Sequence, residues 1–374
     1  MHKILDIDGS RTRLFWADAL KVFSCLFVAC LHSSALALAA FSEAPPLVGN
    51  ANWWMLVILN SISRFAVPVF LMVTGIFLLS PKRKITGKKL FSYIRRIFFV
   101  IIVTSLTWAS IELCFGLPNQ EKTFHSFVSI TLETPYHMWY LWALLGIYLI
   151  TPVLRQIVKD EFALITSIIV GGAIVFGHGI ANQLGNEGAQ LLNHKIISLL
   201  ELIDSKVSIS LTAAFPCIYV LLGYWLATTD FHQRFRRIVY GFSSFGFFVA
   251  GWLIWRTDIL SGSHTADVGN SNIFVAMYSA ALFIYFKEKE KFNSLVILVT
   301  RSVSPYLLWT YAIHSVVLEM FRLLTPLDIF YRYTGIVGAG GVGILVFVIS
   351  VFLAKVIELS KSVLGKCFDK LKME

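Results

Sequence analysis

Ten apolar segments, each roughly as long as a lipid bilayer is thick, dominate this sequence. The hydrocarbon core of a bilayer is about 30 Å thick, and roughly 20 apolar residues in a helix cross it. With 57% hydrophobic and only 14% charged residues, the chain is far more apolar than a soluble domain. We therefore predict an all-α, polytopic integral membrane protein with about ten transmembrane helices, near residues 14–40, 54–79, 91–116, 137–156, 161–181, 207–227, 238–255, 270–286, 303–325 and 334–358.

The connections between these segments are short, and the longest, near residues 182–206, is too short for a separate domain. We expect one membrane-embedded domain over residues 1–374, with its spans within about 14–358 and short tails. The first apolar run is long and begins late, so it predicts a retained span rather than a cleaved signal peptide. The five cysteines show no metal or redox spacing, and we expect no metal site.

The basic residues fall mostly on one side of the predicted spans. With the N-terminus inside, 23 Lys and Arg residues lie on the cytoplasmic side, in the segments 3–13, 82–96, 155–159, 234–237, 287–301 and 361–372. Six lie on the other side, at positions 122, 195, 206, 256, 322 and 332. Cytoplasmic loops retain positive charge during insertion, so we expect both termini in the cytoplasm. This bias explains the net charge of +10 without nucleic acid, and a basic inner surface would contact anionic membrane lipid.

The first span carries ionisable residues on one face. Within "LKVFSCLFVACLHSSALALAA", Lys21 and His32 are 11 residues apart, and Asp18 precedes Lys21 by three. Eleven residues of helix return to within about 20° of the same face and rise about 16 Å. Lys21 is thus expected at the cytoplasmic mouth and His32 deep in the membrane. The simpler alternative is that Lys21 reaches lipid phosphates and His32 bonds to a neighbouring helix.

The second and third spans add two arginines. Arg64, in "NSISRFAVPVFLMVTGIFLL", lies too deep to reach the surface easily, and Pro68 is able to break the helix beside it. An arginine at that depth requires an anionic partner or water. In "KRKITGKKLFSYIRRIFF", the cations from Lys82 to Lys89 fit ordinary topology signalling. For Arg96, phosphate binding and topology signalling are equally good interpretations.

Two later spans contribute histidines and aromatic residues. The segment "PYHMWYLWALLGIYLITPVLR" contains His137, Trp139 and Tyr140. The aromatic residues suit an interfacial belt, and a surface position is an alternative for His137. "YLLWTYAIHSVVLEMF" places His314 near mid-membrane with Glu319 further along. Ionisable groups at such depth usually face a bundle interior or a wet cavity, and they mark functional sites.

Taken together, these segments resemble a known family. The pattern "DALK" followed by a deep His, then "SRFAVPVFLMVTGIFLL", "YHMWYLWALLGIYLITPVL" and "YAIHSVVL", is similar to acyltransferase type 3 proteins from residue 14 to about 358. It is especially similar to the branch that contains the enterobacterial common antigen O-acetyltransferase. Such proteins span the bacterial inner membrane about ten times and transfer an acyl group, commonly acetyl from acetyl-CoA, to an envelope glycan.

The resemblance implies roles for individual residues. His32 matches the essential first-span histidine, Arg64 the second-span motif and Arg96 the basic position that opens the third span. His137, Trp139 and Tyr140 fall on the fourth-span motif, and His314 falls on the late Tyr-x-x-His element. The chain departs from the family where Lys21 replaces the usual Arg and where Tyr93 replaces a frequent second Arg. We expect no counterpart of the hydrolase-like domain that is attached to some relatives.

The expected chemistry is O-acyl transfer without a bound cofactor, and acetyl-CoA is the donor. Lys21 and Arg96 would hold the donor phosphates, with Asp18 paired to a cation at the mouth. His32 would accept the proton of an attacking hydroxyl or be acylated itself, and Arg64 would stabilise the developing negative charge. We place His32, Arg64 and His314 in the catalytic group. The other expected site residues bind substrate: Asp18, Lys21, Arg96, His137, Trp139 and Tyr140. The acceptor would be an envelope glycan or a polyprenyl-linked sugar.

Other classes of protein remain open. A transporter or flippase for a lipid-linked sugar would also bury Arg and His in a bundle, but the two halves of the chain show no repeat. A sensor or assembly partner would not need the deep His and Arg residues. Ser33 and Ser34 follow His32, yet no Ser-His-acid arrangement can be assembled from the spacing.

The charge asymmetry yields a topological prediction. Reporter tags at residue 85 or at the C-terminus should report the cytoplasm, and a tag near residue 190 should report the opposite face, because positive loops stay inside. Fusions to alkaline phosphatase and a fluorescent protein measure this directly. A cytoplasmic signal from residue 190 would overturn the span assignment.

Overall fold

The computed structural model describes residues 14–42, 49–115, 123–188, 211–261 and 269–371. Throughout these residues the regular structure is helical, and no strand occurs among them. The tag position 190 and seven of the cations counted above lie outside the described residues: Lys3, Arg11, Arg13, Lys122, Lys195, Lys206 and Lys372.

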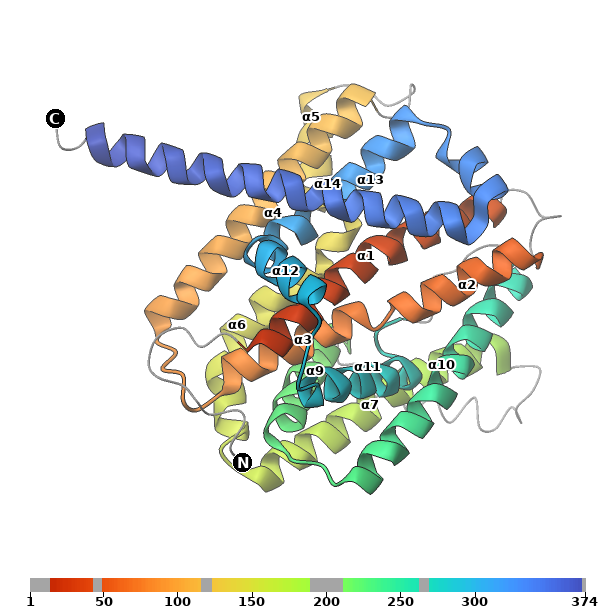
Figure 1. The fold of residues 1–374 in the computed structure, drawn as a ribbon, viewed down its shortest axis with the longest axis vertical. Coiled ribbons are helices and arrows are strands. Elements are labelled where there is room, and N and C mark those ends of the chain that lie inside the picture. Colours follow the sequence, from red (N-terminus) through yellow and green to blue (C-terminus); the bar gives the residue numbers. More distant parts are fainter. Residues whose placement is uncertain (1–13, 43–48, 116–122, 189–210, 262–268, 372–374) are drawn as a thin grey trace.

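Each of the ten predicted segments coincides with helical structure over its described residues (Figure 1). The elements are α1 (Phe15–Ser42), α2 (Ala51–Ser63), α3 (Ala66–Leu79), α4 (Gly87–Phe115), α5 (Phe124–Glu133), the 3-10 helix η2 (Tyr136–Met138), α6 (Trp139–Ile157), α7 (Glu161–Gly188), α9 (Leu211–Thr228), α10 (Gln233–Ser261), α11 (Ile273–Glu288), α12 (Ser294–Val303), the 3-10 helix η3 (Ser304–Tyr306), α13 (Leu307–Leu324) and α14 (Leu327–Leu371). The short helices α5 and α12 were not predicted, because neither is long enough to cross a membrane.

Six helical segments in the described part of the chain are long and apolar enough to span a bilayer. They are Phe15–Phe41, Ala51–Leu79, Gly87–Phe115, Phe124–Ile157, Ser294–Leu324 and Leu327–Lys361, and shorter apolar helices cover Glu161–Gly177 and Phe215–Thr228. The architecture is that of a polytopic membrane protein. The number of about ten spans and the cytoplasmic termini stay predictions.

The second predicted span is broken, as its proline indicated. Helix α2 ends at Ser63 and α3 begins at Ala66, so Arg64 lies at the junction. Pro68 has no N–H to donate to the carbonyl four residues earlier, which is that of Arg64, and its ring crowds the same carbonyl. The Arg64 N–H bonds to the Ser61 carbonyl at 3.3 Å, which closes α2 with a tighter turn.

Helix α1 lies in the middle of the bundle, crossed by the long α14 and flanked by α2, α3 and α13 (Figure 1). Glycines permit the closest helix contacts. A Cβ at Gly75 of α3 would lie 2.0 Å from the Val220 carbonyl oxygen, and one at Gly223 of α9 would lie 2.2 Å from the Met72 Cα. Helices α3 and α9 therefore meet backbone to backbone, which is typical of helix packing in membranes.

Two basic side chains cap the C-terminal ends of the neighbouring helices α3 and α9. We call this end of the bundle the basic end. Arg155 of α6 donates to the carbonyls of Leu78, Ser80 and Arg83 at 2.8, 3.0 and 3.0 Å. Lys287 of α11 donates to the carbonyls of Leu226 and Thr229 at 3.0 and 2.7 Å. The last carbonyls of a helix lack intrahelical donors, so these cations satisfy the ends of α3 and α9. Burial lowers the pKa of Lys287, and the nearby carboxylate of Glu288 opposes this shift.

The glycine contact between α3 and α9 gives a stability prediction. Gly75→Ala and Gly223→Ala should each destabilise the protein by about 1–3 kcal/mol or more, because the added methyl group meets backbone that cannot move aside. Gly177→Ala on α7 is the matched control, since a Cβ there meets nothing within 4 Å. Removing a helical glycine in open space should be neutral or slightly stabilising. Thermal unfolding in detergent micelles measures all three variants, and equal effects at the three positions would contradict the close contact.

Candidate active site

Three imidazole rings meet inside the bundle. The ring centroids of His32 and His314 are 5.2 Å apart, and those of His137 and His314 are 5.1 Å apart. The rings come from α1, η2 and α13, which are far apart in the chain. His137 and His314 are buried, with 1% and 2% exposure, whereas His32 is half-buried. The structure thus brings together three of the nine predicted site residues, and the surface alternative for His137 is wrong.

His137 is held by α13 on two sides. Its Nε2 lies 3.0 Å from the Ala312 carbonyl oxygen, and the Tyr311 hydroxyl donates to the His137 carbonyl at 2.7 Å. A carbonyl only accepts, so Nε2 carries the proton in this bond and Nδ1 of the neutral ring presents a lone pair. That Nδ1 is buried and has no hydrogen-bond partner among the described residues.

His314 has the opposite tautomer. Its Nδ1 bonds to the Tyr311 carbonyl, and its Nε2 lies 3.3 Å from the Ser315 hydroxyl oxygen. Because Nδ1–H donates to the carbonyl, Nε2 is the acceptor of the Ser315 hydroxyl proton. The segment from Tyr311 to Ser315 therefore fixes both buried histidines. Both residues lie in the segment "YAIHSVVL", but sequence analysis assigned no role to Tyr311 or to Ser315.

Aromatic side chains pack against the cluster. The Tyr136 ring meets His32 edge-on at 5.2 Å, and Tyr140 packs against Tyr311 at 5.1 Å. Trp139 lies elsewhere, because it packs on Phe215 of α9 at 5.6 Å. Tyr140 therefore adjoins the cluster and Trp139 does not. Tyr136 was missed by sequence reasoning, although it directly precedes His137.

Arg64 lies next to this cluster, close enough to His32 for electrostatic interaction. Its Nε donates to the Asn60 side-chain oxygen at 3.0 Å, and the Asn60 amide donates to the Ser34 hydroxyl at 3.2 Å. Ser33 bonds to the Tyr331 hydroxyl at 2.9 Å and donates to the Ala339 carbonyl at 2.8 Å. Both serines beside His32 thus take part in helix packing, which argues against a serine nucleophile.

Lys21, the cation of the first span, lies at the basic end, 11 residues before His32 on α1. Lys21 forms an ion pair with Asp18 at 2.8 Å, as one of the sequence alternatives proposed. Its ammonium also lies 5.5 Å from the centroid of the Phe77 ring, and the Arg83 guanidinium lies 4.6 Å from the same ring. Arg83, which was interpreted as a topology signal, therefore joins Lys21 in one positively charged group.

Arg96 occupies a different place. It is exposed on α4, within electrostatic range of Tyr148. Tyr148 in turn packs against Tyr93, with ring centroids 5.5 Å apart. The described contacts join Arg96 neither to Lys21 nor to the imidazole cluster. Within the described residues no three His, Cys, Asp or Glu side chains form a metal-binding group.

The fold and this cluster define a membrane-embedded protein with a polar, histidine-lined interior. The chain belongs to the acyltransferase family described as "Acyltransferase domain", whose model matches residues 14–355. No curated protein and no solved structure matches the chain. Family membership makes the protein a membrane acyltransferase, and it implies in general an acyl donor and a sugar or glycan acceptor.

The bond from Tyr311 to the His137 carbonyl can be tested. Tyr311→Phe should leave a buried carbonyl without its donor, which costs about 1–3 kcal/mol. The unfolding temperature should fall, and hydrogen exchange around η2 should rise. Tyr333→Phe is the control, since Tyr333 is 83% exposed. If the two variants unfold at the same temperature, the Tyr311 hydroxyl does not hold η2.

Proposed function

We propose that the protein is an inner-membrane O-acyltransferase that transfers acetyl from acetyl-CoA to a hydroxyl of a cell-envelope glycan or of its lipid-linked precursor. The observation that carries the proposal is the alignment of two residues on α1. Lys21 lies at the basic end in an ion pair with Asp18, and the half-buried His32 lies about 16 Å further along the same face. Acyl-CoA has matching parts, an anionic head and a thioester at the end of a long arm.

The donor head would bind at the basic end. Lys21 and Arg83 already share the Phe77 ring, and a phosphate group would compete with Asp18 for the Lys21 ammonium. Lysine interacts as a compact point charge and lacks the two-pronged geometry of arginine. Arg83 would supply that geometry in place of the arginine that the family usually has at position 21. Arg96 would extend the cationic surface along α4.

The acyl transfer itself would take place at His32. The acceptor hydroxyl attacks the thioester carbonyl while the His32 imidazole takes its proton, and the Arg64 guanidinium stabilises the oxyanion. The carbon–sulfur bond then breaks, the CoA thiolate takes the proton back from the imidazolium, and an ester remains on the acceptor. In the alternative route, His32 first carries the acyl group and the acceptor attacks in a second step.

The neighbouring histidines would support this reaction. His314 has its Nδ1 bonded to the Tyr311 carbonyl, so its ring orientation is set before substrate arrives. The buried His137 Nδ1 lone pair would accept a hydrogen bond from the acceptor. We place the donor side in the cytoplasm of a bacterial cell, as in the envelope O-acetyltransferases that the sequence resembles.

Mass spectrometry of envelope glycans from cells with and without the protein tests the proposal. An increase of about 42 Da per group, which is the mass of an added acetyl, should appear only with the protein. In a purified system, acetyl-CoA should release free thiol when the acceptor glycan is supplied. Movement of a lipid-linked sugar across liposomes with no acyl donor present would instead favour a flippase.

Two substitutions separate the proposed roles. His32→Ala should lower turnover about 100- to 10,000-fold, the usual cost of losing a general base, and leave the protein folded. Lys21→Ala should mainly raise the KM for acetyl-CoA. Lys21→Arg should retain most of the activity, because it keeps the positive charge. His125→Ala, at an exposed position of α5, is the control. A folded His32→Ala protein with half of normal turnover would remove His32 from the reaction.

A further inference from the structure

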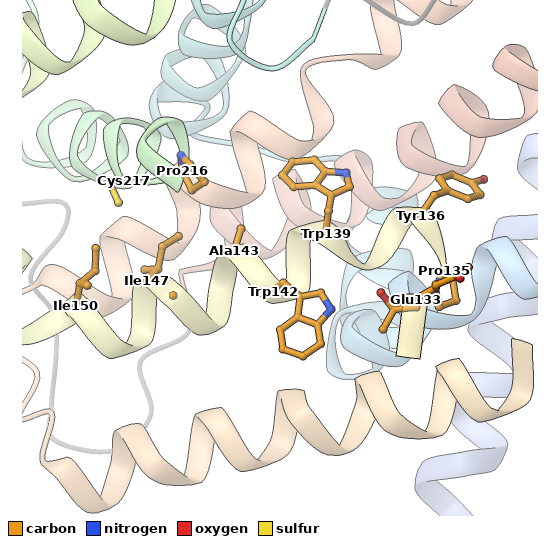
Figure 2. Close-up of a pocket in the computed structure, with 12 residues that line it drawn as sticks. Glu133, Pro135, Tyr136, Trp139, Trp142, Ala143, Ile147, Ile150, Pro216 and Cys217 are labelled. Carbon is orange, nitrogen blue, oxygen red and sulfur yellow. The ribbon is translucent and has the colours of Figure 1, made fainter. Parts of the chain in front are cut away.

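A groove of about 600 Å³ runs along α6 and ends at Tyr136, which packs against the imidazole cluster. Figure 2 shows Glu133, Pro135 and Tyr136 at one end of the groove, with Ile147, Ile150 and Cys217 at the other. Trp139 and Trp142 lie between them and point to different sides of α6. Tyr136 belongs both to the groove and to the site, since its ring meets that of His32 at 5.2 Å.

The shape of the groove follows from small residues on α6. Ala143 and Gly146 are about one helical turn apart and leave room that larger side chains would fill. A Cβ at Gly146 would meet nothing within 4 Å. From Tyr136 to Ile150 the helix rises about 20 Å, so the groove is long and narrow.

The polarity of the groove is graded along its length. Glu133, Thr134 and Tyr136 gather at the end beside the imidazoles, whereas the rest of α6 contributes apolar side chains. The apolar part is open to the side, because Trp142 and Ile150 are 44% and 39% exposed. In a membrane this exposed side faces lipid. The groove therefore suits an amphiphile with a polar head at Tyr136 and a chain that remains in the bilayer.

The head group is expected to be uncharged. Among the described residues that line the groove, Glu133 is the one with a formal charge, and a carboxylate disfavours a phosphate beside it. Hydroxyl groups, in contrast, bond well to a carboxylate and to tyrosine. The two tryptophans along the wall offer the apolar and stacking surface that a chain and a sugar ring require.

We infer that this groove binds the apolar chain of a neutral glycolipid, and that the glycolipid is the acyl acceptor. The inference rests on the proposed function, since it makes the sugar hydroxyl beside Tyr136 the group that would reach His32. The polar end of the groove is at the opposite end of α6 from Arg155, so the acceptor and the donor phosphates approach from different sides. The main rival occupant is the fatty chain of a long-chain acyl donor.

Photo-crosslinking in lipid nanodiscs tests this assignment. The probe is an alkyl glucoside with a long chain that carries a diazirine near its end, used with no acyl donor present. Labelling should concentrate on residues 142–150 and on the peptide that contains Cys217. Excess unlabelled alkyl glucoside should compete, whereas phosphatidylglycerol and free glucose should not.

Matched glycine variants decide whether the labelling reports the groove. Gly146→Phe should reduce it at least fivefold, because a Cβ there meets nothing within 4 Å and the new ring would occupy groove space. Gly241→Phe is the control: Gly241 is an exposed helical glycine of α10, also with nothing within 4 Å of its Cβ. It should leave the labelling unchanged, and thermal unfolding should be similar for both variants.

Three results would overturn the inference. They are labelling spread evenly over the exposed helices, labelling insensitive to Gly146→Phe, and stronger competition by palmitoyl-CoA than by the alkyl glucoside. The last result would assign the groove to a fatty acyl donor. Because the experiment measures binding alone, a protein that fails to transfer acetyl but shows labelling sensitive to Gly146→Phe would lose the proposed function and keep the glycolipid site.

Discussion

A membrane interior offers no water to satisfy polar groups, and the hydrogen bonds between η2 and α13 show how this protein meets that constraint. His137 and Tyr311 each engage backbone of the other's element, through Nε2 to the Ala312 carbonyl and through the hydroxyl to the His137 carbonyl. An unsatisfied group in hydrocarbon costs several kcal/mol, so these bonds strongly favour one arrangement of the two elements. The positions of the imidazole rings depend on it.

The same constraint acts at the helix breaks and ends. Pro68 removes a backbone donor and leaves Arg64 at the junction of α2 and α3, beside His32. At the basic end, Arg155 satisfies carbonyls at the end of α3. Irregular backbone at membrane depth is tolerated only where protein or a wet cavity covers it. Features that disturb a helix thus coincide with the polar interior.

The sequence predicted those parts of the site that local spacing records. The separation of Lys21 and His32 gave their common face, and Pro68 marked the break at Arg64. It did not predict that Tyr136 would meet His32, or that Ser315 would bond to His314, because these contacts depend on how separate helices pack. Arg83 and Arg155 looked like topology signals, since a charge pattern does not show which carbonyl or ring a cation will reach. The short helix α5 lacked the length by which spans are recognised.

The glycine contact between α3 and α9 has a mechanical consequence. Two helices whose backbones touch have no intervening side chains that can change rotamer, so any displacement of one must carry the other. This pair acts as a stiff wall on one side of the interior. The groove lies between this pair and α6, because Pro216 and Cys217 of α9 line it together with Gly146 of α6. If α9 moves only together with α3, a widening of the groove that admits a molecule from the bilayer has to come from movement of α6, so the groove has one rigid and one compliant side.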